Sequence, residues 1–141
     1  MPDRTPLSVV VLTKNESGRL RDCLQSVAWA GELLVIDDES TDDTVRLAES
    51  MGARVLRRKM DVEGRHRNWA NAQAANEWVL SLDADERVTP ELAQELQALL
   101  APDHTPEHQT YSIPRRNYIG ARWVRKVRTY GVAKMTATLK E

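Results

Sequence analysis

The sequence predicts an α/β fold in which helices cover both faces of a mostly parallel sheet. Short, continuous apolar runs alternate along the chain with stretches of helical periodicity, and short loops join them. Polar clusters follow three of the apolar runs, at the strand ends where sheets of this class bind their ligands. With 141 residues, the chain is long enough for one domain with its own core.

The chain begins with a strand, a helix and a second strand. Residues 7–13 (LSVVVLT) and 33–38 (LLVIDD) are continuous apolar runs, which are typical of parallel strands buried on both faces. Residues 17–28, between them, have the periodicity of an amphipathic helix. Cys23 falls on the apolar face of that helix. Because it is the single cysteine, no internal disulfide forms, and we interpret it as a small core residue.

A second helix and a short third strand follow. Ser40 and Asp43 have the spacing of a capping box, and Gly52 is a natural helix stop. A helix is therefore predicted over residues 40–52. Residues 53–58 (ARVLRR) are then interpreted as a third strand.

The next helix–strand pair leads into the most acidic part of the chain. The stretch GRHRNWANAQAAN predicts a helix over residues 64–76, with Trp69, Ala72 and Asn76 on one side. Residues 77–83 (EWVLSLD) predict a fourth strand.

The remaining stretch is predicted to hold one more helix and an extended segment. Thr89 followed by Pro90 marks the start of that helix. Residues 101–108 have the composition of a loop, and residues 110–120 (TYSIPRRNYIG) look extended.

Charge is distributed unevenly along the chain. The net charge of −1 indicates no general affinity for nucleic acid. Residues 1–113 carry 12 basic and 20 acidic residues, whereas residues 114–141 carry 8 basic and 1 acidic. We expect residues 126–141 to form a basic tail that is helical or poorly ordered. Its charge suits phosphate, an anionic membrane surface or simply a solvated face.

The apolar runs are too short for a membrane span, which needs ~20 apolar residues. The N-terminus lacks the basic and apolar regions of a signal peptide. We therefore expect a cytoplasmic protein, with a peripheral contact to the inner face of the membrane through the basic tail as a further expectation.

The fourth strand ends on a cluster of negative charge, Asp83, Asp85 and Glu86. Clustered carboxylates repel each other unless a cation or water lies among them. In an extended segment, residues two apart point the same way, so both aspartates could reach one cation. Carboxylate oxygens suit Mg²⁺ or Mn²⁺, which share phosphate oxygens and can neutralise a leaving diphosphate. A solvated acidic turn is the alternative, because the motif is so short.

Two other clusters have the chemistry of nucleotide binding. Asp37 and Asp38 could accept hydrogen bonds from a base N–H or from ribose hydroxyls, or could stabilise the start of the next helix. The stretch GRHRN places Arg65 and Arg67 at a helix start, where basic groups and backbone N–H groups suit phosphate. His66, in the same stretch, is expected near phosphate or in water. The glycine-rich dinucleotide and P-loop motifs do not occur.

The motifs VVVLTKNES, LLVIDDESTDDT, GRHRNWANAQAANEWVLSLDADE and IPRRNY occur in the order seen in family 2 glycosyltransferases, which the chain resembles over residues 7–125. The resemblance implies a GT-A fold, a Rossmann-like nucleotide-sugar-binding domain, over residues 1–125. The runs SLDADERVTPEL and IPRRNYIGARWVR are most similar to the bacterial lipopolysaccharide-core glucosyltransferases. This implies inverting transfer of a sugar, expected to be glucose, from a UDP-sugar to a glycan or lipid-linked acceptor.

The resemblance also implies which residues form the site. The implied nucleotide-binding residues are Thr13, Asn15 and Glu16 at the nucleoside, Asp37 or Asp38 at the uracil ring, Arg65 and Arg67 near the diphosphate, and Asp83 at the ribose. The implied ligands of Mg²⁺ or Mn²⁺ are Asp85 and Asp83.

The end of the chain departs from the family pattern. Relatives of this kind continue into an acceptor-binding half that carries the general base, usually a carboxylate, whereas residues 126–140 contain no Asp or Glu. No catalytic base is identified, and we expect a segment to be missing through truncation, deletion or a frame shift. One alternative is a donor-binding fragment that holds UDP and metal without catalysis. A remote alternative is a phospho-acceptor signalling domain.

Overall fold

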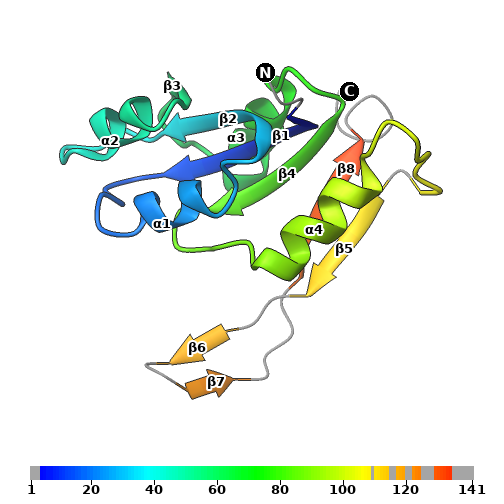
Figure 1. The fold of residues 1–141 in the computed structure, drawn as a ribbon. Coiled ribbons are helices and arrows are strands. Elements are labelled where there is room, and N and C mark those ends of the chain that lie inside the picture. The colour runs from blue at the N-terminus through cyan, green and yellow to red at the C-terminus, as the bar shows by residue number, and fades with distance from the viewer. Residues whose placement is uncertain (1–3, 109, 115–116, 120–121, 125–128, 135–141) are drawn as a thin grey trace.

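The main sheet has six strands in the order β3-β2-β1-β4-β8-β5 (Figure 1). The computed structural model describes residues 4–108, 110–114, 117–119, 122–124 and 129–134. The strands of the main sheet are β1 (Thr5–Thr13), β2 (Ala30–Asp37), β3 (Arg54–Arg57), β4 (Trp78–Asp83), β5 (Thr110–Pro114) and β8 (Thr129–Lys134). The helices are α1 (Leu20–Gln25), α2 (Thr44–Ser50), α3 (Glu63–Ala72) and α4 (Pro90–Leu99). A second, two-stranded sheet consists of β6 (Asn117–Ile119) and β7 (Arg122–Val124).

The first four strands are parallel and confirm the predicted α/β class. β1 pairs with β2 on one side and with β4 on the other, and β2 pairs with β3. The continuous apolar runs of β1, β2 and β4 reflect burial on both faces, which is typical of parallel strands, whereas β3 lies at the edge of the sheet and is exposed or half-buried. From β1 the chain adds β2 and β3 on one side of the sheet and β4 on the other, so the order of the strands changes direction between β1 and β4. Sheets of this class bind ligands beyond the carboxyl ends of the strands at such a switch point.

Alternate residues of β1 face two separate cores. Leu7, Val9 and Val11 belong to the larger core, which includes buried residues of α1, α2 and α4. Val10 points to the opposite face, where it packs in a smaller core with Ala70 of α3. This period of two follows from strand geometry. Figure 1 shows the result: α1 and α4 lie in front of the sheet and α3 lies behind it.

The start of α4 agrees with the sequence prediction. Thr89 is the N-cap residue, and its Oγ1 accepts a hydrogen bond from the backbone N–H of Leu92 at 3.1 Å. Pro90 occupies the first turn, where a missing N–H costs nothing because that group has no partner within the helix.

The capping box predicted for the second helix is wrong. α2 begins at Thr44, and its N-cap residue Asp43 makes no capping hydrogen bond through its side chain. Ser40 instead donates its hydroxyl proton to Asp37 at 2.6 Å. The polar residues of this stretch therefore shape the loop after β2 rather than a helix start.

α3 buries a different face from the one predicted. His66 and Ala70, four residues apart, are 2% and 0% exposed, whereas Ala72 is exposed. Trp69 is half-buried, and Asn76 lies beyond the end of the helix. The predicted stripe failed because it extended the helical period past Ala72, where the helix ends.

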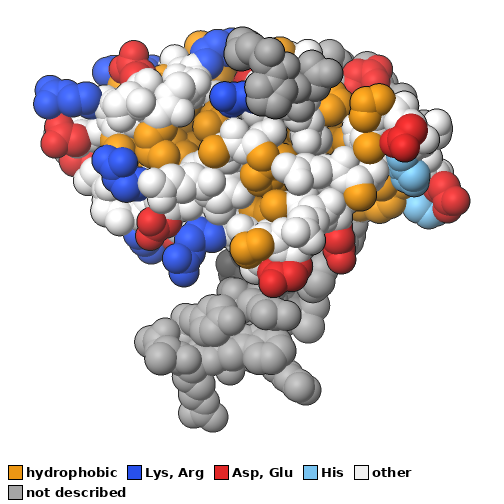
Figure 2. Space-filling view, in the orientation of Figure 1, with side chains coloured by type: hydrophobic (Ala, Val, Ile, Leu, Met, Phe, Trp, Pro, Cys, Tyr) orange, Lys and Arg blue, Asp and Glu red, His pale blue; other side chains and the backbone are white. Residues whose placement is uncertain are grey.

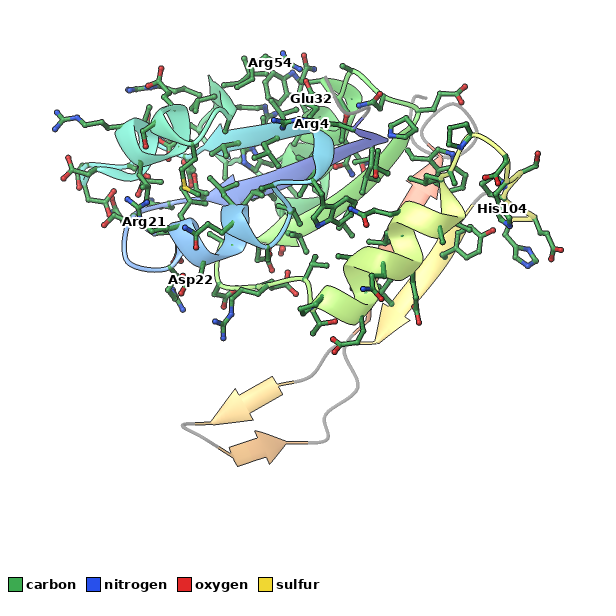
Figure 3. The ribbon with its side chains drawn as sticks, viewed as in Figure 1. Arg4, Arg21, Asp22, Glu32, Arg54 and His104 are labelled. Carbon is green, nitrogen blue, oxygen red and sulfur yellow. The ribbon has the colours of Figure 1, made fainter. Side chains whose placement is uncertain are left out.

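A cluster of polar residues links β1, β2 and β3 near the amino ends of these parallel strands. Glu32 accepts hydrogen bonds from the Ser8 hydroxyl and the Ala75 backbone N–H, both at 2.8 Å, and pairs with Arg54 at 3.0 Å. Figure 3 shows Glu32 and Arg54 close together. Burial opposes ionisation of Glu32, but the hydrogen bonds from Ala75, Ser8 and Arg54 outweigh it and lower its pKa.

The segment predicted as a basic tail contributes a strand to the main sheet. Residues 129–134 form β8, which pairs antiparallel with β4 and with β5. The prediction of a helical or poorly ordered tail is therefore wrong for these residues. Their sequence, TYGVAK, contains the β-branched and aromatic residues that favour strands, but the prediction rested on charge. Residues 126–128 and 135–141 lie outside the described residues.

The charged surface and the length of the helices are relevant to the predictions about nucleic acid and the membrane. Figure 2 shows acidic and basic side chains mixed over the side of the molecule that carries α1 and α2, whereas the charged side chains over α4 and the loop after it are acidic. Among the described residues, the structure has no helix that is long and apolar enough to cross a membrane. The basic side chains proposed to contact a membrane lie in a part of the chain whose side chains the structure does not describe.

Candidate functional site

The ends of three parallel strands meet at one edge of the sheet. Thr13 of β1 is the register partner of Asp37 of β2, and Leu12 is the partner of Asp83 of β4. The three polar clusters that follow these strands therefore start side by side, as the sequence predicted. They flank the reversal of strand order between β1 and β4, where this class of sheet binds its ligands.

Asp37 is buried and holds this edge together. Its carboxylate is 0% exposed and accepts hydrogen bonds from the Thr13 hydroxyl at 3.0 Å and from the Ser40 hydroxyl and backbone N–H at 2.6 and 2.9 Å. Thr13 is also buried. A buried carboxylate is stable only when such donors surround it. The side chains of Asp37 and Thr13 thus bond to each other and to the loop after β2.

Asp38 has different surroundings from its neighbour. Its backbone N–H donates to the Thr13 carbonyl at 2.9 Å, and its Oδ1 accepts from the backbone N–H of Met60 at 3.1 Å. The loop that follows β3 therefore lies beside Asp38, and it exposes Met60 and Val62. Apolar groups beside one well-placed carboxylate suit a ring that has both a flat face and a polar edge.

The loop after β1 is tied to the loop after β2. Asn15 has a φ of 53°, in the left-handed region that asparagine tolerates, and its Oδ1 accepts from the Thr41 backbone N–H at 2.8 Å. The backbone N–H of Glu16 donates to the Thr44 hydroxyl at 2.9 Å. The Glu16 carboxylate accepts from Arg19 at 2.8 Å. These bonds fix the shape of the loop at the carboxyl edge of the sheet.

The two arginines of the GRHRN stretch occupy different places. Arg67 donates to the Ser81 hydroxyl at 2.6 Å and to Asp83 at 3.2 Å, so it joins α3 to the end of β4. Arg65 is largely exposed and pairs with Asp61 at 3.3 Å, one turn earlier in the chain. The structure therefore brings Arg67, but not Arg65, into contact with the predicted acidic residues.

The acidic residues after β4 lie in a turn, which we call the acid turn (residues 83–88). The backbone N–H of Glu86 donates to the Asp83 carbonyl at 2.9 Å. The chain is thus not extended here, and the argument that Asp83 and Asp85 point the same way fails. The two carboxylates pair with different arginines: Asp83 with Arg67 at 3.2 Å, and Asp85 with Arg19 at 3.8 Å.

Asp83 and Asp85 nevertheless have the chemistry that a divalent cation needs. Their side chains are 44% and 51% exposed at the carboxyl edge of the sheet, and both offer carboxylate oxygens. Within the described part of the chain, no group of three or more acidic, histidine or cysteine side chains could hold a metal. Mg²⁺ commonly binds through one or two carboxylates together with substrate phosphates. The residues fit a cation shared with a diphosphate.

One ionisable group near the site was placed wrongly from the sequence. His66 is 2% exposed, so it lies neither in water nor at a surface where phosphate could reach it. Its Nδ1 is 2.8 Å from Arg58, which stacks over Trp69 with its guanidinium carbon 5.5 Å from the ring centroid. Arginine has no acceptor, so Nδ1 must accept and the neutral ring carries its proton on Nε2. Burial, followed by the charge of Arg58, lowers the pKa of His66.

A sheet of this order with polar clusters at its carboxyl edge is the arrangement of nucleotide-binding α/β domains. The particular family follows from sequence comparison. The model of glycosyl transferase family 2 matches residues 8–137, and the chain belongs to that family.

Relatives in two bacteria illustrate the match. An uncharacterized glycosyltransferase of Rickettsia conorii is 36% identical over 108 residues, which are 76% of this chain and 38% of that protein. The lipopolysaccharide core biosynthesis glycosyltransferase LpsC of Rhizobium meliloti is 28% identical over 124 residues, covering 84% of this chain and 45% of LpsC. The chain thus spans less than half the length of either relative.

Solved structures show the GT-A fold that the motifs implied. S. aureus TarS 1–349 in complex with UDP-GlcNAc superposes with a TM-score of 0.64 at 26% identity, covering 85% of this chain and 37% of that one. The glucosyl-3-phosphoglycerate synthase of Mycobacterium tuberculosis, in complex with Mn²⁺, UDP and glucosyl-3-phosphoglycerate, superposes with a TM-score of 0.57 at 25% identity, covering 76% of this chain and 42% of that one.

Proposed function

We propose that this domain binds a UDP-sugar together with Mg²⁺ or Mn²⁺, as the donor-binding part of an inverting glycosyltransferase. The observation that carries the proposal is that the polar residues after β1, β2 and β4 lie side by side, where the strand order changes direction between β1 and β4. The UDP-GlcNAc complex of TarS and the Mn²⁺–UDP complex of the mycobacterial synthase support this class of ligand.

The proposed roles follow from the surroundings of each side chain. Asp38 accepts from the N3–H of uracil, while Met60 and Val62 offer apolar contact beside it. Asp83 accepts from the ribose hydroxyls, and Arg67, which contacts Asp83, binds the diphosphate. Arg65 is also proposed near the diphosphate, although it now pairs with Asp61.

The loop after β1 is proposed to line the nucleoside. Thr13, Asn15 and Glu16 direct their side chains to protein partners, so they would act by fixing the loop backbone against the nucleoside. Asp83 and Asp85 would hold the metal. When bound, that ion neutralises charge on the leaving diphosphate.

The transferred sugar and its acceptor are proposed more narrowly than the family match. We infer glucose as the sugar and a glycan such as lipopolysaccharide core as the acceptor, with LpsC as the supporting relative. The reaction is proposed for the cytoplasm, with the basic residues of 114–141 as a contact to the inner face of the membrane. Membership of family 2 argues against a phospho-acceptor signalling domain.

Calorimetry of the 141-residue chain with UDP tests the proposal. We expect binding heat with UDP and Mn²⁺, and much weaker binding when a chelator removes the metal. Asp85→Ala should weaken Mn²⁺-dependent binding about 10-fold or more, the scale on which changes at a metal site act. Asp103→Ala, in an exposed loop, is the matched control. If Asp85→Ala bound UDP and Mn²⁺ as tightly as the unchanged chain, the metal assignment would be wrong.

A transfer assay separates the enzyme from the donor-binding fragment. The chain is mixed with UDP-glucose, Mn²⁺ and a heptose-containing core acceptor, and the glycosylated product is measured. Product formation supports a transferase. UDP binding without any product favours a fragment that holds the donor without catalysis.

A further inference from the structure

We propose that Glu86 is a positioning residue for the metal site, and that Ser26, the C-cap residue of α1, braces the acid turn. The inference rests on the proposed function, because it concerns the same turn that carries Asp83 and Asp85. It assigns a role to Glu86, the third acidic residue of the cluster, which has no part in the proposed binding of nucleotide and metal.

The Glu86 side chain folds back onto the strand it follows. Its Oε1 accepts a hydrogen bond from the backbone N–H of Asp83 at 2.7 Å. In the opposite direction, the Glu86 backbone N–H donates to the Asp83 carbonyl at 2.9 Å. Two bonds between the same pair of residues close the turn from both sides. The bond to the carboxylate is the stronger kind, because its acceptor is charged.

Helix α1 and its C-cap residue Ser26 contact both ends of the acid turn. The Ser26 hydroxyl accepts from the backbone N–H of Val88 at 3.0 Å and donates to the Cys23 carbonyl at 2.6 Å. The Cys23 thiol lies 3.8 Å from the Asp83 carbonyl, a weak hydrogen bond. Cys23 and Val88 are 0% and 4% exposed, so these contacts are shielded from water. The backbone that presents Asp83 and Asp85 is therefore fixed at its two ends.

The three acidic residues thus divide two tasks between them. The side chains of Asp83 and Asp85 are partly exposed and pair with arginines, whereas the Glu86 carboxylate is hydrogen-bonded to the backbone of the turn. A metal ligand must be held close to its productive geometry before the metal arrives. Removal of the Glu86 carboxylate should therefore weaken metal binding even though both metal ligands remain.

The test measures the Mn²⁺ concentration that gives half-maximal UDP binding to the 141-residue chain. Glu86→Ala should raise that concentration about 10-fold or more, as changes to groups that orient metal ligands do. Glu86→Gln keeps an oxygen acceptor for the Asp83 N–H and should stay close to the unchanged chain. Ser26→Ala should shift it in the same direction as Glu86→Ala by a smaller factor. Glu91→Ala, exposed on α4, is the matched control.

A second readout separates positioning from general damage. UDP affinity at saturating Mn²⁺ should be unchanged in every variant, and thermal unfolding should show that each is folded. If Glu86→Ala does not fold, Ser26→Ala decides with the same two readouts. A Glu86→Gln variant as impaired as Glu86→Ala would overturn the inference, since the carboxylate charge would then bind metal directly.

Two more results would also overturn the positioning role. One is an unchanged Mn²⁺ requirement in Glu86→Ala, and the other is an equal loss of UDP affinity at saturating metal. Both leave the proposed function standing. If the unchanged chain shows no Mn²⁺-dependent UDP binding, the proposed function itself fails and the inference fails with it.

Discussion

Asp37 and Asp38 show how two adjacent carboxylates come to have different roles. Asp37 ends β2 and points to buried donors, whereas Asp38 lies one residue beyond the strand and meets the loop after β3. The motif LLVIDD contains both and could not separate them. The choice depends on where β2 ends relative to Thr13 on the neighbouring strand, which is a tertiary fact.

Asp37→Ala is predicted to destabilise the fold. The change leaves the Ser40 hydroxyl and backbone N–H without their acceptor, and leaves the buried Thr13 hydroxyl only the Ile36 carbonyl at 3.5 Å. Because each buried donor without an acceptor costs the free energy of its desolvation, the free energy of unfolding should fall by about 3 kcal/mol. Urea unfolding measures this, with Asp103→Ala, in an exposed loop, as the control. A loss no greater than in the control would contradict the structural role.

Asp38→Ala is predicted to impair base selection. A carboxylate accepts from the N3–H of uracil, whereas N3 of cytosine is itself an acceptor. The unchanged chain should therefore prefer UDP over CDP, and the variant should lose about 1.5–3 kcal/mol of UDP affinity, the range for a hydrogen bond to a charged group. Competition calorimetry with the two nucleotides measures both. Equal affinity of the unchanged chain for UDP and CDP would rule out this role for Asp38.

His66 should make stability depend on pH. Its pKa is lowered in the folded protein by burial and by Arg58, so the unfolded chain binds the proton more readily. The contribution is fully present above the unfolded-state pKa, about 6.5, and is lost as the pH falls through the folded-state pKa. Urea unfolding between pH 5 and 8 should show stability rising with pH.

Substitution of single histidines identifies the source of that slope. His66→Gln should flatten it, although the substitution also lowers stability at every pH because the site is buried. His104→Gln should leave it unchanged, because His104 is exposed in the loop after α4 (Figure 3). A slope that persists in His66→Gln would assign the effect to another group.

At the scale of elements, the start of α4 shows where a local signal was sufficient. Thr89→Ala removes the acceptor for the Leu92 N–H and should lower the free energy of unfolding by about 1 kcal/mol. Thr89→Ser keeps the hydroxyl and should retain most of that stability. Thr105→Ala, in an exposed loop, is the control for the urea unfolding experiment. Equal stability of Thr89→Ala and the unchanged chain would show that the cap contributes nothing.

Element types could be predicted from the sequence, but several boundaries and contacts could not. Apolar runs and helical periods report burial of neighbouring residues, so β1, β2 and β4 were found from residues close in the chain. The capping box of α2 failed because Ser40 has a tertiary partner in Asp37. The acid turn departs from the extended segment that the sequence predicts, because no residue within it signals the return of the Glu86 carboxylate to Asp83.

At the scale of the whole molecule, the strand that carries Asp83 is held in the sheet by strands from distant parts of the chain. β4 lies between β1 and β8, and β8 pairs residues more than fifty positions away, with Trp78 opposite Lys134. Local patterns carry no information on such pairing. The order of the motifs predicts the GT-A fold, because the motifs lie at the ends of β1, β2 and β4. They contain no information on β8, which pairs with β4.

The last prediction concerns that bracing. β5 pairs with β8, and β8 joins it to β4 at Val79 and Leu80. Deletion of residues 126–141 would leave the backbone groups of β4 unpaired along one edge and leave β5 without the strand that connects it to the sheet. Unpaired edges of apolar strands promote association between molecules. We therefore expect chain 1–125 to unfold at a lower temperature than the full chain and to aggregate.

Thermal unfolding with light scattering compares the two chains directly. Val132→Pro offers the same test without a deletion, because proline at the centre of β8 removes a backbone N–H from a strand paired on both sides. Val132→Ile retains the backbone donor and serves as its control. If chain 1–125 unfolded at the same temperature as the full chain and stayed monomeric, the donor domain would end at residue 125, and β8 would not support the strand that carries Asp83.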